Sequence, residues 1–290
     1  MRFICCFFGL IAFVFLDEQL PGRPQAPSTA TEPEKGTILL GGGCFESGAG
    51  PMIRKKLAEL AGNRARLVII PTADPMLEPA TSTGKATLLA DYEKQAKAMF
   101  SAVGFGDISI LHTRNRSSAD SRELTVALQK ASAVWIPGGG SDLLEQAYAN
   151  TSMSSELRAV LARGGVVAGD SAGAYVLAQF GVSRQRSTMQ IGMIEGGLSV
   201  LPNTFVLVHS NVMRENAKNL TDIAAFAASH PKLLGISIDE NTAVVIRRGR
   251  IAEILGSGSV SIVDGSKGIN GAWISLSPAH ELDLKTRKVI

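Results

Sequence analysis

The chain has little cysteine, few aromatic residues and no strong charge of either sign. Of its 290 residues, 6% are aromatic and 19% charged, and 29 basic against 26 acidic side chains leave a formal net charge of +3. A surplus this small, spread along the chain, gives no basic surface for nucleic acid. The same composition excludes a collagen, a coiled coil and a disordered tail. We therefore expect a globular protein with no nucleic-acid partner.

Only three cysteines are present, and Cys5 and Cys6 lie in the first apolar run of the chain. Beyond that run only Cys44 remains, so no intramolecular disulfide is expected there. What the chain does contain is 45% hydrophobic residues and 30 glycines. Apolar residues in that proportion, together with many glycines, are typical of an α/β enzyme that is stabilised by its core.

An apolar run opens the chain. Residues 3–16 contain only apolar residues, cysteine and glycine, and lie between Arg2 and the acidic pair Asp17 and Glu18. A span of the bilayer needs about 20 residues, so this shorter run predicts a signal peptide over residues 1–18. Residues 19–35, rich in Pro, Ser, Thr and charge, predict a flexible linker. We expect a secreted or periplasmic protein. Because no Ala-x-Ala cleavage site follows, an uncleaved membrane anchor is the alternative.

Short apolar strands alternate with helical segments from residue 36 onward. The strands are expected at 37–40, 67–70, 108–111, 133–136 and 165–168, and the helices at 51–60, 86–103, 122–131, 143–148 and 155–163. This alternation predicts an α/β fold with a doubly wound, mostly parallel sheet and helices on both faces. Ligands of such sheets bind at the carboxyl ends of the strands. With no second core and no repeat, residues 36–290 are expected to form a single domain.

The sharpest local feature lies at residues 165–174. A strand enters Gly169-Asp170-Ser171-Ala172-Gly173, and a helix is expected over 174–180. Strand, Gly-x-Ser-x-Gly and helix in this order are typical of a nucleophile elbow, in which the serine hydroxyl stands above the sheet. The backbone N–H groups of the following helix would face a developing oxyanion. Ser171 is the candidate nucleophile.

A serine nucleophile needs a base, and the chain has four histidines: His112, His209, His230 and His280. His209 directly follows the apolar run 204–208, which would put it at the same sheet edge as the elbow. His112 also ends a strand but precedes the serine, whereas His230 is expected in a surface turn before a Pro and His280 in the polar tail. His209 is therefore the candidate general base.

Taken together, these motifs resemble those of the cyanophycinase and dipeptidase E group of serine peptidases. The resemblance covers about residues 36–265 and lies closer to the cyanophycinase branch. The segments that carry it are Gly41-Gly42-Gly43, Ile70-Pro71-Thr72-Ala73, Gly139-Gly140 with Leu143, Gly169 to Ala174, Gly197-Leu198 with Leu201-Pro202, His209, and Gly235 to Ala243. It implies a flavodoxin-like fold of the class I glutamine amidotransferase type. It also implies a peptide or isopeptide-like substrate, no cofactor and no metal, and a homodimer.

The resemblance also implies roles for individual residues. Ser171 would be the nucleophile and His209 its base, and N–H groups of Gly139 or Gly140 and of Ala172 would form the oxyanion hole. An acidic residue between serine and histidine is expected to orient the imidazole.

That position falls near Gln185, where no carboxylate stands, so Gln185 is the candidate for the third catalytic position. Glu195 is the nearest later acid and is expected in a solvated loop. For the pair Asp239-Glu240 a structural role at a strand end is expected.

The positions that contact substrate in the family fall at Asp142, Arg214 and Asn216. Cyanophycinases have Gly-Gly-Asp-Gln where this chain has Gly139-Gly140-Ser141-Asp142, and an Asp where this chain has Leu207. Asp142 is able to attract a cationic substrate group, or simply to cap a helix.

The sequence therefore predicts an exported serine hydrolase that cleaves a peptide or isopeptide-like amide. Two alternatives stay open. One is a hydrolase of a different amide or of an ester. The other is a catalytically silent binding protein, which the missing carboxylate at Gln185 favours.

Overall fold

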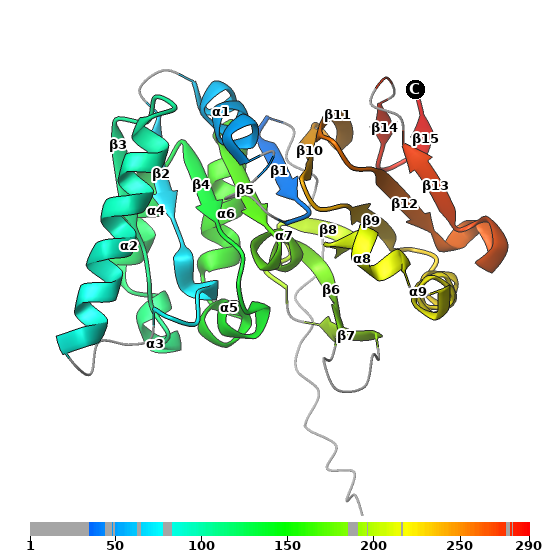
Figure 1. Cartoon of the computed structure of the whole chain (residues 1–290), viewed down its shortest axis with the longest axis horizontal. Helices are drawn as coiled ribbons and strands as arrows, with labels where there is room; N and C mark the ends of the chain where they lie inside the picture. The colour runs from blue at the N-terminus through cyan, green and yellow to red at the C-terminus, as the bar shows by residue number, and fades with distance from the viewer. Residues whose placement is uncertain are drawn as a thin grey trace, which may run out of the picture. The chain divides into compact units, whose positions relative to one another are not determined.

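The arrangement of the strands decides which loops meet at the candidate site. The structure, a computed structural model, describes residues 35–43, 48, 50–62, 65–77, 83–184, 191–195, 197–215, 217–276, 279 and 281–290 (Figure 1). The signal peptide and linker expected over residues 1–35 lie outside these ranges except for Lys35, as do Cys44, Gln185, Asn216 and His280. All described residues belong to one compact unit.

The predicted parallel strands form the centre of the larger sheet. They are β1 (Thr37–Gly41), β2 (Arg66–Ile69), β3 (Asp107–Ile110), β4 (Ala133–Ile136) and β5 (Val166–Asp170). Antiparallel strands extend the sheet beyond β1, namely β10 (Thr242–Arg247), β11 (Arg250–Gly256), β14 (Leu282–Asp283) and β15 (Lys288–Val289). The order is β15-β14-β11-β10-β1-β5-β4-β2-β3. The sheet is thus parallel in one half and antiparallel in the other.

Helices cover both faces of this sheet (Figure 1). Side chains alternate along β1, so that Ile38 and Leu40 enter one core and Leu39 enters the other. The first core contains residues of α3 (Arg116–Ala119), α4 (Arg122–Lys130), α5 (Ser141–Tyr148), α6 (Met153–Ala162) and α7 (Ala172–Leu177). The second contains residues of α1 (Gly50–Ala61) and α2 (Thr83–Ser101). The predicted α/β fold class is confirmed.

A second sheet was not expected from the sequence. Its strands are β6 (Ala178–Arg184), β7 (Ile191–Glu195), β8 (Leu201–Leu207), β9 (Leu234–Ile238), β12 (Val260–Asp264) and β13 (Trp273–Leu276). They run in the order β13-β12-β9-β8-β6-β7, and α9 (Ala217–Ser229) packs against Phe205 of β8. The helix predicted over 174–180 is wrong from Ala178 onward. There the backbone becomes extended, with ψ 169°, and pairs with β8.

Strand register brings the carboxyl ends of both sheets together. In the larger sheet Gly41 pairs with Asp170 and Ile136 with Gly169. In the second sheet the parallel neighbours β8 and β9 pair Leu207 with Ser237. The turn after β1 joins the two sheets, because Gly42 O accepts the N–H of His209 at 2.8 Å and Gly43 O accepts that of Asn241 at 3.1 Å.

Among the described residues, no helix has both the length and the apolarity needed to cross a bilayer. The turns after β1, β4, β5, β8 and β9 lie where the carboxyl ends of the two sheets meet, and the candidate site is built from them.

Candidate active site

Ser171 occupies a strained turn between β5 and α7. Its backbone angles are φ 49° and ψ −116°, a region that residues with a side chain rarely adopt. Two flanking glycines make the turn possible. A Cβ on Gly173 would lie 1.9 Å from the carbonyl oxygen of Ile136, and one on Gly169 would lie 2.4 Å from Gly173. The strand–turn–helix geometry expected of a nucleophile elbow is present.

The side chain of His209 forms a hydrogen bond with this serine. The Oγ atom of Ser171 and the Nε2 atom of His209 are 2.7 Å apart, which is a short hydrogen bond. His209 follows β8 and begins the short helix α8 (Ser210–Arg214) in a left-handed conformation with φ 52°. The ring lies against the turn after β1, since a Cβ on Gly43 would be 2.2 Å from its Cε1 atom. The structure thus brings together the two residues that the sequence singled out.

The other ring nitrogen of His209 contacts a carboxylate. Its Nδ1 atom lies 2.8 Å from Oε1 of Glu240, and the side chains of these two residues are 37% and 30% exposed. With the proton of the neutral imidazole on Nδ1, Nε2 accepts the hydrogen bond from the serine hydroxyl. Ser171, His209 and Glu240 form one continuous line of hydrogen bonds.

Glu240 corrects the expectation of a purely structural role for Asp239-Glu240. The residue that accepts the Nδ1 hydrogen bond follows β9, not β6, whereas Gln185 lies outside the described residues and Glu195 is described only by its backbone. No local pattern in the sequence points to Glu240. It reaches His209 because β8 and β9 are parallel neighbours whose ends meet at one edge, where His209 stands two positions beyond Leu207 and Glu240 three beyond its partner Ser237.

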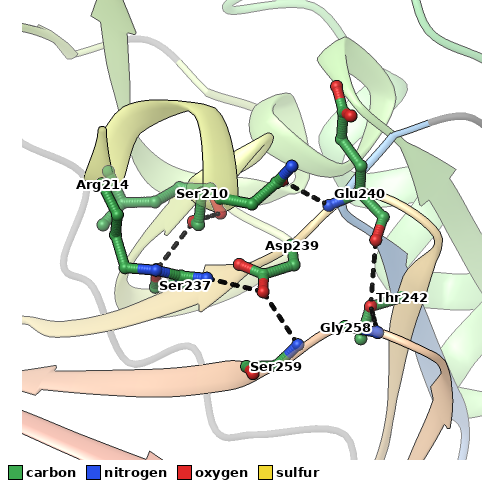
Figure 2. Close-up of polar contacts among 10 residues, drawn as sticks. Ser210, Arg214, Ser237, Asp239, Glu240, Thr242, Gly258 and Ser259 are labelled. Atoms are coloured by element: carbon green, nitrogen blue, oxygen red, sulfur yellow. Dashed lines mark hydrogen bonds and ion pairs between the residues drawn. The ribbon is translucent and has the colours of Figure 1, made fainter. Parts of the chain in front are cut away.

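Two contacts fix α8 against the turn that carries Glu240 (Figure 2). The Oδ1 atom of Asn211 accepts the backbone N–H of Glu240 at 3.0 Å. The guanidinium of Arg214 donates to Oδ2 of Asp239 at 2.6 Å, and the same oxygen accepts the N–H of Ser259 at 2.9 Å. In Figure 2 the Glu240 side chain points away from this ion pair, to the other side of the turn.

Arg214 is expected to contact substrate, and in the structure its side chain also has a partner within the protein. Its guanidinium is engaged with Asp239, whose side chain is only 7% exposed. The pair links the helix that begins at His209 to the turn that holds Glu240, so its role in the fold is to hold two site residues in register. Asn216, the other residue of that segment expected at the substrate, lies outside the described residues.

The glycine turn after β4 lies beside the nucleophile. A Cβ on Gly138 would be 3.0 Å from Cβ of Ser171, so the backbone here passes close to the serine. The N–H of Gly140 donates to the carbonyl of Ala73 at 2.8 Å. Because the N–H of Gly140 is engaged in this bond, Gly139 is the better candidate of the two glycines expected in the oxyanion hole. Ala172 is the first residue of α7, where an N–H has no carbonyl four residues earlier in the helix.

A cavity of about 520 Å³ opens beside Ser171 and His209. Its other lining residues are Asp74, Tyr92, Gln95, Ala96, Met99, Phe100, Trp135, Pro137, Gly138 and Asp170. Asp142 is exposed in the first turn of α5 and is not among them. Its negative charge helps instead to raise the pKa of the neighbouring Glu145 carboxyl, although burial is the larger cause.

The other described histidines are not among the residues that line this cavity, and each has contacts elsewhere. His112 shares a hydrogen bond of 3.1 Å with Thr72, which also bonds to Tyr148 at 2.8 Å. Burial lowers the pKa of His112. His230 stacks on Phe226. In the described part of the chain, no cluster of three or more His, Cys, Asp or Glu side chains is placed to hold a metal ion.

Known proteins are similar to this chain in sequence and in fold. The model of peptidase family S51 matches residues 37–254. A cyanophycinase of Geminocystis herdmanii is 28% identical over 240 residues, which cover 80% of this chain and 81% of that protein. A cyanophycinase of Trichormus variabilis is 28% identical over 247 residues, which cover 83% of this chain and 75% of that protein.

Among solved structures, a peptidase from an acI-B1 Actinobacterium has the same fold. It matches with a TM-score of 0.66 at 22% identity over 87% of this chain and 98% of its own. The resemblance stated from the motifs is confirmed. Because the family model matches most of the sequence, the chain belongs to peptidase family S51 and is a serine-type peptidase.

Proposed function

We propose that this peptidase hydrolyses an amide bond of a peptide or isopeptide-like substrate with Ser171 as nucleophile, His209 as general base and Glu240 as the residue that orients His209. The single observation that carries the proposal is the unbroken line of hydrogen bonds, 2.7 Å from Ser171 to His209 and 2.8 Å from His209 to Glu240. Hydrogen bonds in this order activate a serine at neutral pH.

In the first step the Ser171 hydroxyl attacks the scissile carbonyl. Its proton passes to Nε2 of His209, and the Glu240 carboxylate stabilises the imidazolium that results. The N–H groups of Gly139 and Ala172 are the proposed donors to the oxyanion. His209 then gives the proton to the leaving amine, the carbon–nitrogen bond breaks, and an acyl-enzyme remains on Ser171.

In the second step water replaces the amine. His209 removes a proton from the water, the resulting hydroxide attacks the acyl carbonyl, and the carbon–oxygen bond to Ser171 breaks. The serine regains its proton from His209. Besides substrate and water, these two steps use Ser171, His209, Glu240 and the backbone N–H groups of the proposed oxyanion hole.

The substrate class rests on the family. The matched relatives are cyanophycinases, so a β-linked aspartyl peptide is the first substrate to try. A different amide or an ester is the second substrate class to try. It is supported by the residues that differ from cyanophycinases at Asp142 and Leu207, and by the ion pair of Arg214 with Asp239.

The test is covalent labelling of the purified mature chain with a fluorophosphonate. Wild type is compared with Ser171→Ala, His209→Ala and Glu240→Gln, and circular dichroism checks that each variant is folded. We expect labelling of wild type, none in the first two variants and strongly slowed labelling in the third. Absence of labelling in the folded wild type would overturn the mechanism and favour a binding protein.

We further propose export, with residues 1–18 as the cleaved leader and a homodimer as the mature form. The apolar run of residues 3–16 supports the first and the family resemblance the second. Intact mass of the protein recovered outside the cytoplasm tests cleavage. A full-length mass in the membrane fraction would mean an uncleaved anchor, and a monomer in sedimentation would refute the dimer.

A further inference from the structure

The residue before the nucleophile is a buried carboxylate. Asp170 ends β5 and is 5% exposed. Its Oδ1 atom accepts the backbone N–H of Gly43 at 3.1 Å. The same oxygen lies over the last residue of β1, because a Cβ on Gly41 would clash with it. A buried carboxylate costs free energy unless hydrogen bonds offset the loss of water, and the bond to Gly43 links Asp170 to the turn after β1.

The candidate triad consists of Ser171, His209 and Glu240, and this one turn holds the backbone of all three segments that carry it. Its three carbonyls each accept one backbone N–H: Gly41 O from Ser171 at 3.0 Å, Gly42 O from His209 at 2.8 Å, and Gly43 O from Asn241, the residue after Glu240, at 3.1 Å. The three segments follow β5, β8 and β9, which belong to two different sheets. The turn therefore sets the spacing of three side chains that come from separate parts of the fold.

Gly43 is the residue of this turn that Asp170 restrains. Gly41 is fixed by the strand ladders on both sides of β1. Gly43 lies two residues beyond those ladders and has φ 124°, a conformation that favours glycine. Its peptide is held by the bond of its N–H to Asp170 and by the bond that its carbonyl accepts from Asn241. Because a Cβ on Gly43 would overlap Cε1 of His209, a shift of this peptide is passed directly to the imidazole ring.

We infer that Asp170 is a positioning residue of this peptidase, whose carboxylate fixes the Gly43 peptide and thereby the alignment of the candidate triad. The inference rests on the proposed function, because it concerns how the same three side chains are aligned. Asp170 takes no proton in this scheme and acts only through the turn. Without its acceptor, the buried N–H of Gly43 has to turn toward another partner. The His209 ring then loses the geometry of its bonds to Ser171 and Glu240.

Contact with the ligand is the other role that the place of Asp170 allows, because its side chain also lines the cavity beside Ser171. The two roles differ in what they change. Misalignment of the triad lowers the rate of the chemical step, whereas a lost contact with the ligand weakens binding. Fluorophosphonate labelling over a range of probe concentrations measures both, as the limiting rate at saturation and as the concentration that gives half that rate.

Two variants separate the hydrogen bond from the volume of the side chain. Asp170→Leu keeps a branched shape but has no acceptor for the N–H of Gly43, whereas Asp170→Asn keeps an acceptor oxygen. We expect the limiting rate to fall at least about 30-fold in Asp170→Leu and to stay within about fivefold of wild type in Asp170→Asn. The half-rate concentration should stay within about threefold of wild type in both variants. Asp170→Ala replaces the leucine variant if that variant does not fold.

A second buried aspartate provides the matched control. Asp264 accepts the N–H of Ser266 at 3.0 Å and forms an ion pair with Arg287. It pairs with Leu234, at the opposite end of β9 from Glu240. Asp264→Leu and Asp264→Asn should lower the melting temperature but label at the wild-type limiting rate, because they remove a buried carboxylate that does not hold the turn after β1.

Four results would overturn the inference while labelling of wild type still supports the proposed function. One is a limiting rate of folded Asp170→Leu within about threefold of wild type. Another is a change confined to the half-rate concentration, which would assign Asp170 to ligand binding. The third is Asp170→Asn as slow as Asp170→Leu, and the fourth is an equal loss of rate in Asp170→Leu and Asp264→Leu. Absence of labelling in the folded wild type overturns the proposed function and the inference with it.

Discussion

A single methyl group on Gly43 should disable the site while leaving the fold almost intact. A Cβ at this position would lie 2.2 Å from Cε1 and 2.6 Å from Nδ1 of the His209 ring. Carbon atoms pack no closer than about 3.5 Å, so the ring has to retreat by about 1.3 Å. The ring is the movable partner, since the opposing atom belongs to a backbone that pairs with Asn241 through Gly43 O.

That retreat breaks two short contacts at once. The ring holds Ser171 at 2.7 Å and Glu240 at 2.8 Å, and neither bond survives a displacement of this size in good geometry. A misplacement of about 1 Å costs on the order of 10²-fold in rate. We therefore expect Gly43→Ala to lower the rate of fluorophosphonate labelling by about 100-fold.

A glycine elsewhere separates this clash from backbone strain. Gly43 has φ 124°, so alanine there is also strained. Gly62 has φ 78°, but no described atom lies within 4 Å of its added Cβ. Gly62→Ala should therefore lower the melting temperature as Gly43→Ala does but label at the wild-type rate. Labelling of Gly43→Ala within about threefold of wild type would refute the steric reasoning.

Three further predictions follow from other contacts. Glu240→Gln keeps the shape of the side chain but loses its charge, so labelling should slow by about 10³-fold, whereas Gln185→Ala should stay within about threefold; the reverse result would restore Gln185 as the third member. Arg214→Ala leaves Asp239 buried without its cation, so the free energy of unfolding should fall by about 2 kcal/mol in urea melts and the labelling rate by about tenfold. Arg214→Lys should recover most of that rate, and a rate untouched by Arg214→Ala would limit the pair to a structural role. His112 has its pKa lowered by burial. The unfolded chain therefore binds more protons below pH 6.5, and stability should fall as the pH drops through that window. His112→Gln should flatten this loss in thermal melts between pH 7 and pH 5, and an unchanged slope would contradict it.

Ser171 and His209 were predictable because each directly follows an apolar strand. Buried parallel strands read as short apolar runs, and their carboxyl ends meet at one edge, so sequence position alone indicates proximity. The 2.7 Å between Oγ of Ser171 and Nε2 of His209 agrees with that rule. Local sequence sufficed here because the elbow and the strand end are both defined within about ten residues.

Glu240 was not predictable by the same means. Its approach to His209 depends on β8 and β9 being parallel neighbours, and α9 separates these strands along the chain. The helix predicted around Ala178 was wrong for a related reason. Its short apolar run fits a helix or a buried strand equally well, and pairing with β8 decides in favour of the strand. Both cases require knowledge of the second sheet, which no local pattern supplies.

The position of Glu240 also bears on the choice between an enzyme and a silent binding protein. The silent protein was favoured because no carboxylate stands at Gln185. The carboxylate of Glu240, however, lies 2.8 Å from Nδ1 of His209. Ser171 and His209 both hold positive φ angles, 49° and 52°, in conformations that cost of order 1–3 kcal/mol each. A protein that only binds has no need to keep two strained residues aimed at one another. Their strain has a use if a proton must pass from Oγ to Nε2 along a fixed path, which favours the hydrolase.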